Sequence, residues 1–105
     1  MASPKNNKAR GFNFEREIVN RAKAEGLEAV RAWGSNGRSI GEAETVDCKV
    51  SGLRIQAKRV KTLAAKYQIP DGADLVVFRE DRGETFALIP FEDWLTFVKS
   101  TQPTK

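Results

Sequence analysis

Three polar residues that could hold a metal ion and activate water fall on one face of a predicted β-hairpin. Apolar and polar residues alternate through residues 45–58, on both sides of a Ser51-Gly52 pair that suits a two-residue turn. In such a hairpin the numbers of paired residues sum to 103, which places Asp47 opposite Gln56 and Lys58 two positions further along the same face. An acid, an amide oxygen and an ammonium group would then converge. This arrangement favours a metal-dependent site that hydrolyses phosphodiester bonds.

The oxygen atoms of this face suit a hard divalent cation. Mg²⁺ prefers oxygen ligands in octahedral geometry and keeps several waters. Asp47 could supply a carboxylate, Gln56 a side-chain carbonyl and Ala57 a backbone carbonyl. Lys58 would orient or help to deprotonate the attacking water and offset charge on the phosphate. We therefore expect Mg²⁺ as the cofactor, with Mn²⁺ able to substitute. The alternative for Asp47 is a cross-strand salt bridge with a lysine or arginine. Gln56 and Lys58 alone are weak signals, because alternating polar residues are common on an exposed strand.

Glu15 is a second candidate ligand, on a helix predicted over Asn13–Glu25 and ended by Gly26. At 100° per residue, Glu15 projects into the middle of the helix's apolar stripe. The stripe consists of Ile18, Val19 and Ala22. A carboxylate aimed at a core is costly unless it is paired or binds a metal. The alternative is a helix N-terminal charge or the partner of an arginine. Together with the hairpin, however, Glu15 is expected at the metal site.

Composition limits the remaining possibilities. A chain of 105 residues, 40% hydrophobic and 30% charged, forms one globular domain. No apolar run approaches about 18 residues, and the polar N-terminus is unlike a signal peptide, so we expect no membrane association. The single cysteine, Cys48, excludes an internal disulfide and is expected to pack in the core. This favours the cytoplasm, or the host cytoplasm if a virus encodes the chain. The absence of histidine removes most zinc sites and His-based triads, which leaves carboxylates, lysine, hydroxyls and a hard metal for catalysis.

The basic residues are concentrated where a phosphate backbone could lie. Eighteen Lys and Arg against fourteen Asp and Glu give a formal charge of +4. They cluster near the start of the chain, beside the glycine-rich loop 34–41 and around the hairpin, whereas the C-terminal third is nearly balanced. This distribution favours a surface that binds nucleic acid over a basic surface that is only solvated. The basic residues that we expect to contact the phosphates are Arg10, Arg16, Arg31, Arg38, Arg54, Arg59 and Lys61.

The order of predicted elements indicates an α/β (α+β) fold with a central mixed β-sheet flanked by helices. We divide the chain into a flexible basic arm at 1–10, a single domain at 11–100 and a frayed tail at 101–105. Besides the first helix and the hairpin at about 45–59, the predicted elements are a strand at 27–32, a helix at 61–67, strands at 73–79 and 85–89, and a helix at 91–99. The aromatic residues follow these periodicities and are expected in the core or at an interface, with base stacking as the alternative. They are Phe14, Phe78, Phe86, Phe91, Trp94 and Phe97.

The hairpin motif resembles the PD-(D/E)xK nuclease superfamily, through Val46-Asp47 followed by Gln56-Ala57-Lys58. Residues 10–19 (RGFNFEREIV), residues 26–31 and the Gly34-Ser35 loop together resemble archaeal-type Holliday junction resolvases. The similarity runs from about residue 10 to residue 59.

The resemblance implies a restriction-endonuclease-like core and a set of site residues. By position, Glu15, Asp47 and Gln56 would surround the metal, and Lys58 would be the catalytic lysine. Ser35 would lie in a loop that contributes to cleavage. Arg10 and Arg31 would contact phosphates. Proteins of this family act as homodimers that cut two strands near a four-way DNA junction.

Two residues depart from the family's pattern. Val46 replaces the usual proline, which alters only the local entry to the strand. Gln56 replaces the usual acid, so either metal affinity falls or a second carboxylate compensates. Glu42 and Glu44 are close enough in sequence to assist, although both are expected to be loop charges. Glutamine at this position is similar to what some restriction-type branches of the superfamily have, so inactivity does not follow.

We therefore expect a Mg²⁺-dependent, structure-selective DNA endonuclease, a Holliday junction resolvase that acts as a homodimer on four-way or other branched DNA. The alternative is a non-catalytic or restriction-like DNA-binding module that keeps the nuclease fold.

Overall fold

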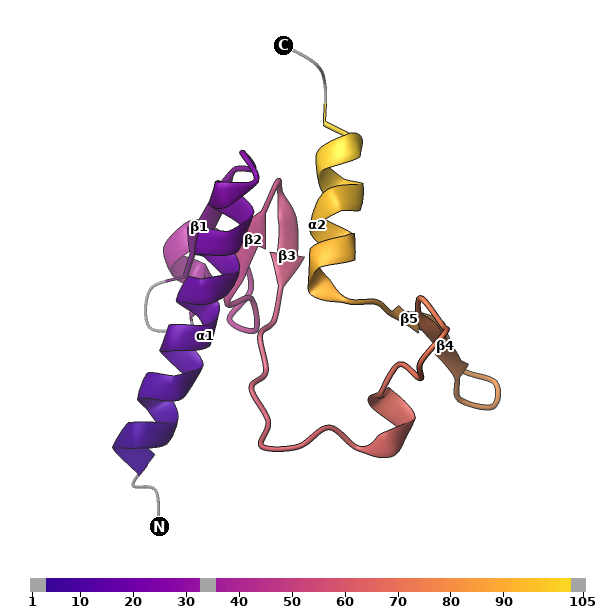
Figure 1. The fold of residues 1–105 in the computed structure, drawn as a ribbon. Helices are drawn as coiled ribbons and strands as arrows, with labels where there is room; N and C mark the ends of the chain where they lie inside the picture. Colours follow the sequence, from indigo (N-terminus) through magenta and orange to yellow (C-terminus); the bar gives the residue numbers. More distant parts are fainter. Residues whose placement is uncertain (1–3, 33–35, 103–105) are drawn as a thin grey trace. The chain divides into compact units, whose positions relative to one another are not determined.

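The structure, a computed structural model, describes residues 4–32 and 36–102, with side chains from residue 13 onward. By its internal contacts the chain divides into two compact units, Met1–Arg59 and Val60–Lys105 (Figure 1). Each unit is described separately below. The expectation of a single domain over residues 11–100 stays a prediction.

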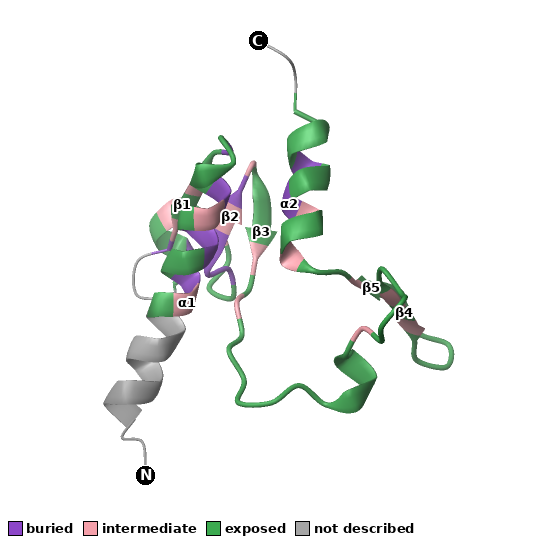
Figure 2. Cartoon of the chain, viewed as in Figure 1, coloured by how far each residue is buried: buried purple, intermediate pink, exposed green. Residues whose placement is uncertain are grey.

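The first unit packs one long helix on a small sheet. Its elements are α1 (Pro4–Ala24), β1 (Ala29–Arg31), the 3-10 turn η2 (Gly37–Ile40), β2 (Cys48–Val50) and β3 (Leu53–Ile55). The three strands form an antiparallel sheet in the order β1-β2-β3, and α1 lies against β1 and β2 (Figure 1). The buried apolar residues of this unit gather between the helix and the sheet (Figure 2). They are Ile18, Val19, Ala22, Leu27, Ala32, Val46, Cys48 and Val50.

Helix α1 begins earlier than the sequence pattern indicated. It starts at Pro4 rather than Asn13 and therefore includes most of the segment expected to be a flexible arm. Proline suits the first turn of a helix, where its missing N–H would have no helical partner, and no β-branched residue follows it before Ile18. The end was predicted correctly. Gly26 has φ +80 and donates its N–H to the Lys23 carbonyl at 2.9 Å, as left-handed glycines do at helix ends.

The β2–β3 hairpin has the predicted register. Cys48 pairs with Ile55, Lys49 with Arg54, and Val50 with Leu53, so each pair sums to 103. Both turn residues have positive φ, at 50° for Ser51 and 82° for Gly52. Two consecutive residues with positive φ form the turn type whose twist matches that of the flanking strands. The turn therefore fixes which residues of the two strands face each other.

The second unit contains a hairpin and a helix. Its elements are the 3-10 turn η3 (Ala65–Tyr67), β4 (Val76–Arg79), β5 (Thr85–Leu88) and α2 (Phe91–Ser100). Strands β4 and β5 pair antiparallel, from Val76 opposite Leu88 to Arg79 opposite Thr85. In α2 the buried residues are Leu95 and Val98, one turn apart, as the helical spacing predicted.

The helix predicted over 61–67 is wrong apart from the short turn η3. Every residue from 60 to 68 is exposed, so a helix here would have no buried stripe to stabilise it. The residue before the turn, Ala64, makes no side-chain capping bond. Pro70 follows closely and biases the preceding residue away from helical geometry. Neither packing nor capping therefore supports a longer helix.

The α+β class is confirmed, but the strands do not form one mixed sheet. The described strands form two antiparallel sheets, of three and two strands. Both hairpins join neighbouring strands through short turns, of two residues in β2–β3 and five in β4–β5. A parallel pair would need a crossover of a dozen residues or more. Among the aromatic residues, Phe86 and Phe97 are 57% and 64% exposed, so neither is a core residue.

We predict that Gly37→Ala destabilises the protein by about 1–3 kcal/mol, because an added methyl overpacks a site without space. Gly37 is buried, and a Cβ there would meet the carbonyl oxygens of Ala43 and of Val46, the latter at 2.9 Å. Unfolding by urea measures the effect. The control is Asn20→Ala on the exposed side of α1, for which a change within about 0.5 kcal/mol is expected. Equal stability of the two variants would contradict this packing.

Candidate functional site

Two carboxylates are buried in the first unit. Glu15 lies on the inward stripe of α1 and is 4% exposed, as the helical spacing predicted. Asp47 immediately precedes β2 and is 9% exposed. An ionised carboxylate is rarely buried without a hydrogen bond or an ionic partner, since it loses its hydration. Two such groups in a unit of this size therefore indicate a functional site.

Both carboxylates act on one thiol. Burial raises the pKa of the Cys48 thiol to about 11, and the negative charges of Glu15 and then Asp47 contribute to this increase. A charge affects a buried neighbour in this way only at short range. In agreement with this, Asp47 directly precedes Cys48, and Glu15, 32 positions earlier, lies on α1, which packs against the strand β2 that contains Cys48. At neutral pH the thiol stays protonated, so Cys48 packs in the core and is neither nucleophile nor metal ligand.

Asp47 is positioned by an irregularity in the hairpin. Its N–H donates to the carbonyl of Ile55 at 2.8 Å, yet Ile55 is already the residue paired with Cys48. Two consecutive residues therefore face one residue of the partner strand, which is the pattern of a β-bulge. The regular ladder ends at Cys48, so the expectation that Asp47 pairs directly with Gln56 is wrong. A bulge redirects the side chain of the extra residue, and this explains why Asp47 is buried despite its place on the polar face.

A short hydrogen bond fixes the Asp47 carboxylate. Its Oδ2 atom accepts the backbone N–H of Ala57 at 2.7 Å. Hydrogen bonds to an ionised acceptor are shorter and stronger than neutral ones. The carboxylate is thereby tied to the backbone of the residue between Gln56 and Lys58.

Gln56 and Lys58 lie on either side of this hydrogen bond. Both side chains are exposed and Ala57 is half-buried, so the alternation continues beyond the end of β3. No hydrogen bond or ion pair joins either side chain to another residue in the described part of the chain. The structure thus brings the backbone of both residues to Asp47 and leaves their side chains available to a ligand.

The donor set fits a hard cation by its chemistry. Within residues 4–32 and 36–102 there is no cluster of three or more His, Cys, Asp and Glu residues that could hold a metal. Mg²⁺, however, is commonly bound through one or two carboxylates together with substrate phosphates and waters. Glu15 and Asp47 could supply the two carboxylates. The Gln56 amide oxygen and the Ala57 carbonyl are the other protein oxygens of the predicted set.

The two loop glutamates are engaged elsewhere, as expected. Glu42 accepts a hydrogen bond from Lys49 Nζ at 2.8 Å and lies 3.9 Å from Arg54. The hydrogen bond to Lys49, followed by the charges of Lys49 and Arg54, outweighs desolvation and lowers the pKa of Glu42. Glu44 pairs with Arg38 at 2.7 Å on the surface. Neither glutamate compensates for the missing acid at position 56.

The remaining predicted contacts are distributed over both units. Arg16, Arg59 and Lys61 are exposed and Arg31 is half-buried, with Lys61 belonging to the second unit. Arg38 and Arg54 are the partners of Glu44 and Glu42. The side chain of Arg10 and the whole of Ser35 lie outside the described residues.

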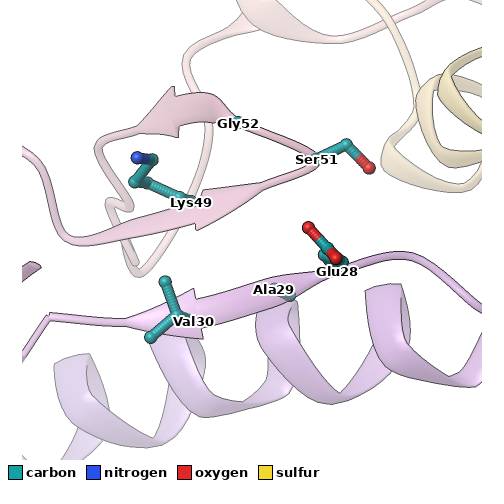
Figure 3. A pocket seen from close by; sticks show the side chains of 6 residues that line it. All are labelled: Glu28, Ala29, Val30, Lys49, Ser51 and Gly52. Carbon is teal, nitrogen blue, oxygen red and sulfur yellow. The ribbon is translucent and has the colours of Figure 1, made fainter.

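Two hollows border this region. One, of about 310 Å³, is lined by Asn13, Phe14, Glu17 and Arg59. Phe14, expected in the core or at an interface, is half-buried at this hollow. Two features of the sequence could have indicated this hollow. Phe14 directly precedes Glu15, and Arg59 directly follows Lys58. The other hollow is lined by residues 28–30, Lys49 and the hairpin turn (Figure 3). Lys49 is bound to Glu42 there, so this second hollow offers no free cation.

We predict that Asp47→Ala lowers stability by about 1–3 kcal/mol, because the Ala57 N–H loses its acceptor in a partly buried place. Asp47→Asn keeps an acceptor oxygen and should cost less. Urea unfolding at neutral pH measures both, with Asp81→Ala in the exposed β4–β5 turn as a control that changes little. Equal losses for the alanine and asparagine variants would show that the hydrogen bond is not what Asp47 contributes to stability.

No described helix is long and apolar enough to cross a membrane.

Comparison with known proteins identifies the family. A family model described as archaeal Holliday junction resolvase (hjc) matches residues 6–93, which include Glu15 and the whole hairpin. Neither a curated protein nor a solved structure gives a match. The family match agrees with the α+β architecture and the buried carboxylates, and the chain belongs to the archaeal Holliday junction resolvase family, a family of nucleases.

Proposed function

We propose that this protein is a divalent-metal-dependent endonuclease that cuts branched DNA, with the four-way junction as its substrate. The observation that carries the proposal is that Glu15 and Asp47 are both buried in the first unit, with Asp47 hydrogen-bonded to the residue that precedes Lys58. Membership of the resolvase family supports the nuclease chemistry. Metal dependence and selectivity for branched DNA are the parts that we add.

The roles of the residues follow from their chemistry. Glu15 and Asp47 would hold the cation, together with the Gln56 amide oxygen and the Ala57 carbonyl. When bound, Mg²⁺ supplies positive charge that polarises the phosphate and lowers the pKa of a coordinated water. The hydrogen bond from Ala57 fixes the orientation of the Asp47 carboxylate before any ligand arrives. A site preorganised in this way needs little rearrangement when charge develops in the transition state.

Lys58 acts on the reacting phosphate and water. Its exposed ammonium group can donate hydrogen bonds to the attacking water and to a phosphate oxygen. These contacts orient the water for attack on phosphorus and offset the negative charge that grows on the phosphate oxygens. Lys58 directly follows Ala57, so the hydrogen bond from Ala57 ties the backbone beside the lysine to the ligand carboxylate.

The basic residues would bind the DNA backbone. Arg16 and Arg59 are exposed on the unit that holds Glu15 and Asp47. Arg38 and Arg54 would exchange their glutamate partners for phosphates. Exposed ion pairs of this kind contribute only about 0–1 kcal/mol, so the exchange costs little. Arg10, Arg31, Lys61 and Ser35 stay in the proposal as contacts implied by charge and by the family.

A homodimer is also part of the proposal, because one small domain offers little surface to span a branched substrate. Sedimentation with and without four-way DNA tests this, and a monomer under both conditions would overturn it.

We predict that Asp47→Asn and Lys58→Ala abolish cleavage while leaving junction binding within about threefold of the unmodified protein. The first removes a ligand charge and the second removes the donor to the phosphate. Neither removes a large share of the positive surface that binds DNA. A gel assay with Mg²⁺ measures cleavage, and anisotropy measures binding in Ca²⁺. The matched controls are Asp81→Asn and Lys23→Ala, at exposed positions of the same residue types.

The substrates in that assay are four-way, forked, nicked and linear duplex DNA. Preferred cutting of the four-way form supports the proposal. No cutting of any form by the unmodified protein would favour the non-catalytic alternative, to which Gln56 lends support. Cutting of linear duplex at a preferred sequence would favour a restriction-like enzyme.

We also predict that Gln56→Glu lowers the Mg²⁺ concentration needed for half-maximal cleavage. A carboxylate at this position restores the third negative charge, and affinity for a hard cation rises with ligand charge. Titration of cleavage rate with Mg²⁺ measures the shift, with Gln68→Glu at an exposed position of the second unit as control. An unchanged half-maximal concentration would remove Gln56 from the metal site.

A further inference from the structure

The second unit carries a pocket in which aromatic rings and cations are combined. It has a volume of about 620 Å³ and is lined by residues of the η3 turn and of the β4–β5 hairpin. Ligand sites in proteins commonly measure about 300–1,000 Å³. Every residue discussed below belongs to this unit, and none is part of the proposed cleavage site.

Three aromatic rings line the pocket. The ring of Tyr67, from η3, meets that of Phe78 edge to face, with centroids 5.6 Å apart and planes at 75°. Phe86 lies directly opposite Phe78 in the strand register. Phe86 is 57% exposed and Tyr67 is 39% exposed, so much of their ring surface is open to a ligand. The contact between Tyr67 and Phe78 holds η3 against the hairpin.

Positive charge borders the rings. The Lys66 ammonium nitrogen lies 5.2 Å from the centroid of the Tyr67 ring. The Arg79 Nε atom donates to Thr85 Oγ1 at 2.8 Å, which fixes the guanidinium group while its remaining N–H donors stay available. Glu80 is the one acidic residue of the lining, against these two cations. The pocket therefore combines π-faces with a net positive rim.

We propose that this pocket binds an unstacked DNA base together with its adjacent phosphate. Proteins that hold single-stranded nucleic acid stack bases on aromatic rings and place Lys or Arg along the backbone. Phe86 and Tyr67 would take the base, and Lys66 and Arg79 the phosphate. This inference rests on the proposed action on branched DNA, whose unpaired or splayed bases would be the ligand.

Charge favours DNA over a second copy of the chain in this pocket. A like-to-like contact would bring Lys66 and Arg79 of each copy near those of the other, with only one Glu80 per copy to neutralise them. A nucleotide brings the opposite charge. The apolar ring surface could pack against either DNA or a second copy of the chain. The charges of Lys66 and Arg79 therefore distinguish the two occupants and favour DNA.

Phe86→Ala tests the proposal in the full chain. Because Phe86 is mostly exposed, its removal should leave the fold intact, which urea unfolding checks. We expect affinity for a short single-stranded oligonucleotide to fall about 5- to 150-fold, the range for losing one base–aromatic stack. Phe86→Trp should restore it. The matched control is Phe97→Ala on α2, a Phe with 64% exposure outside the pocket, which should leave affinity unchanged.

A second readout follows the base itself. An oligonucleotide containing 2-aminopurine should lose fluorescence on binding, and a Phe86→Ala variant should abolish that quenching. Equal affinities for the unmodified protein and the Phe86→Ala variant would overturn the inference, as would equal losses for the Phe86 and Phe97 variants. A Phe86→Ala variant that sediments as a smaller species than the unmodified protein, yet binds the oligonucleotide normally, would instead identify the pocket as a self-association surface. That result would also overturn the inference.

These results are separable from the test of cleavage. Quenching that depends on Phe86 in a protein that cuts no DNA would refute the nuclease proposal and keep the pocket. Cutting of four-way DNA without any effect of Phe86 on single-strand binding would refute the pocket and keep the nuclease.

Discussion

The candidate site depends on one hydrogen bond, in which Asp47 Oδ2 accepts the Ala57 N–H at 2.7 Å. The regular ladder between β2 and β3 has already ended at Cys48 and Ile55, so backbone pairing alone does not hold the segment that contains Lys58. The Asp47 side chain takes over that task. One carboxylate thereby joins the two strand ends and ties the proposed metal ligand to the backbone beside the proposed catalytic lysine. A bulge at Asp47 makes this possible, because it turns the side chain out of the strict alternation of the strand.

Burial of two acids in one small unit has an electrostatic consequence. Desolvation is the larger cause of the raised pKa of the buried Cys48 thiol, and the negative charges of Glu15 and Asp47 both add to it. Two cations of the hairpin, Lys49 and Arg54, are paired with Glu42. In the proposed function, Glu42 would thus keep these two side chains from competing with a divalent cation for Asp47.

The sequence predicted those features that follow from local periodicity. The hairpin register follows from alternation around Ser51-Gly52, and the burial of Glu15 follows from its place on a helical stripe. The bulge at Asp47 was not predictable from the sequence. It depends on which carbonyl of the partner strand accepts the Asp47 N–H, and residue type does not determine this. The helix expected near residue 61 failed for a related reason: propensity favoured it, but no buried surface exists there to stabilise it. For the site, Glu15 and Asp47 are both buried in the first unit, their convergence on a metal stays a prediction, and Arg10 and Ser35 lie outside the described side chains.

The glutamine at position 56 can be understood from the same electrostatics. A third carboxylate beside Glu15 and Asp47 would add to their repulsion before a cation binds, and an amide does not. Gln56 is exposed, however, so water would screen most of that repulsion, and the gain in stability from the amide is small. A bound cation would contact the side-chain oxygen directly, where screening is weakest. In the proposed site the amide would therefore change cation affinity far more than it changes the stability of the fold, and Glu15 and Asp47 would supply the negative charge that attracts the cation.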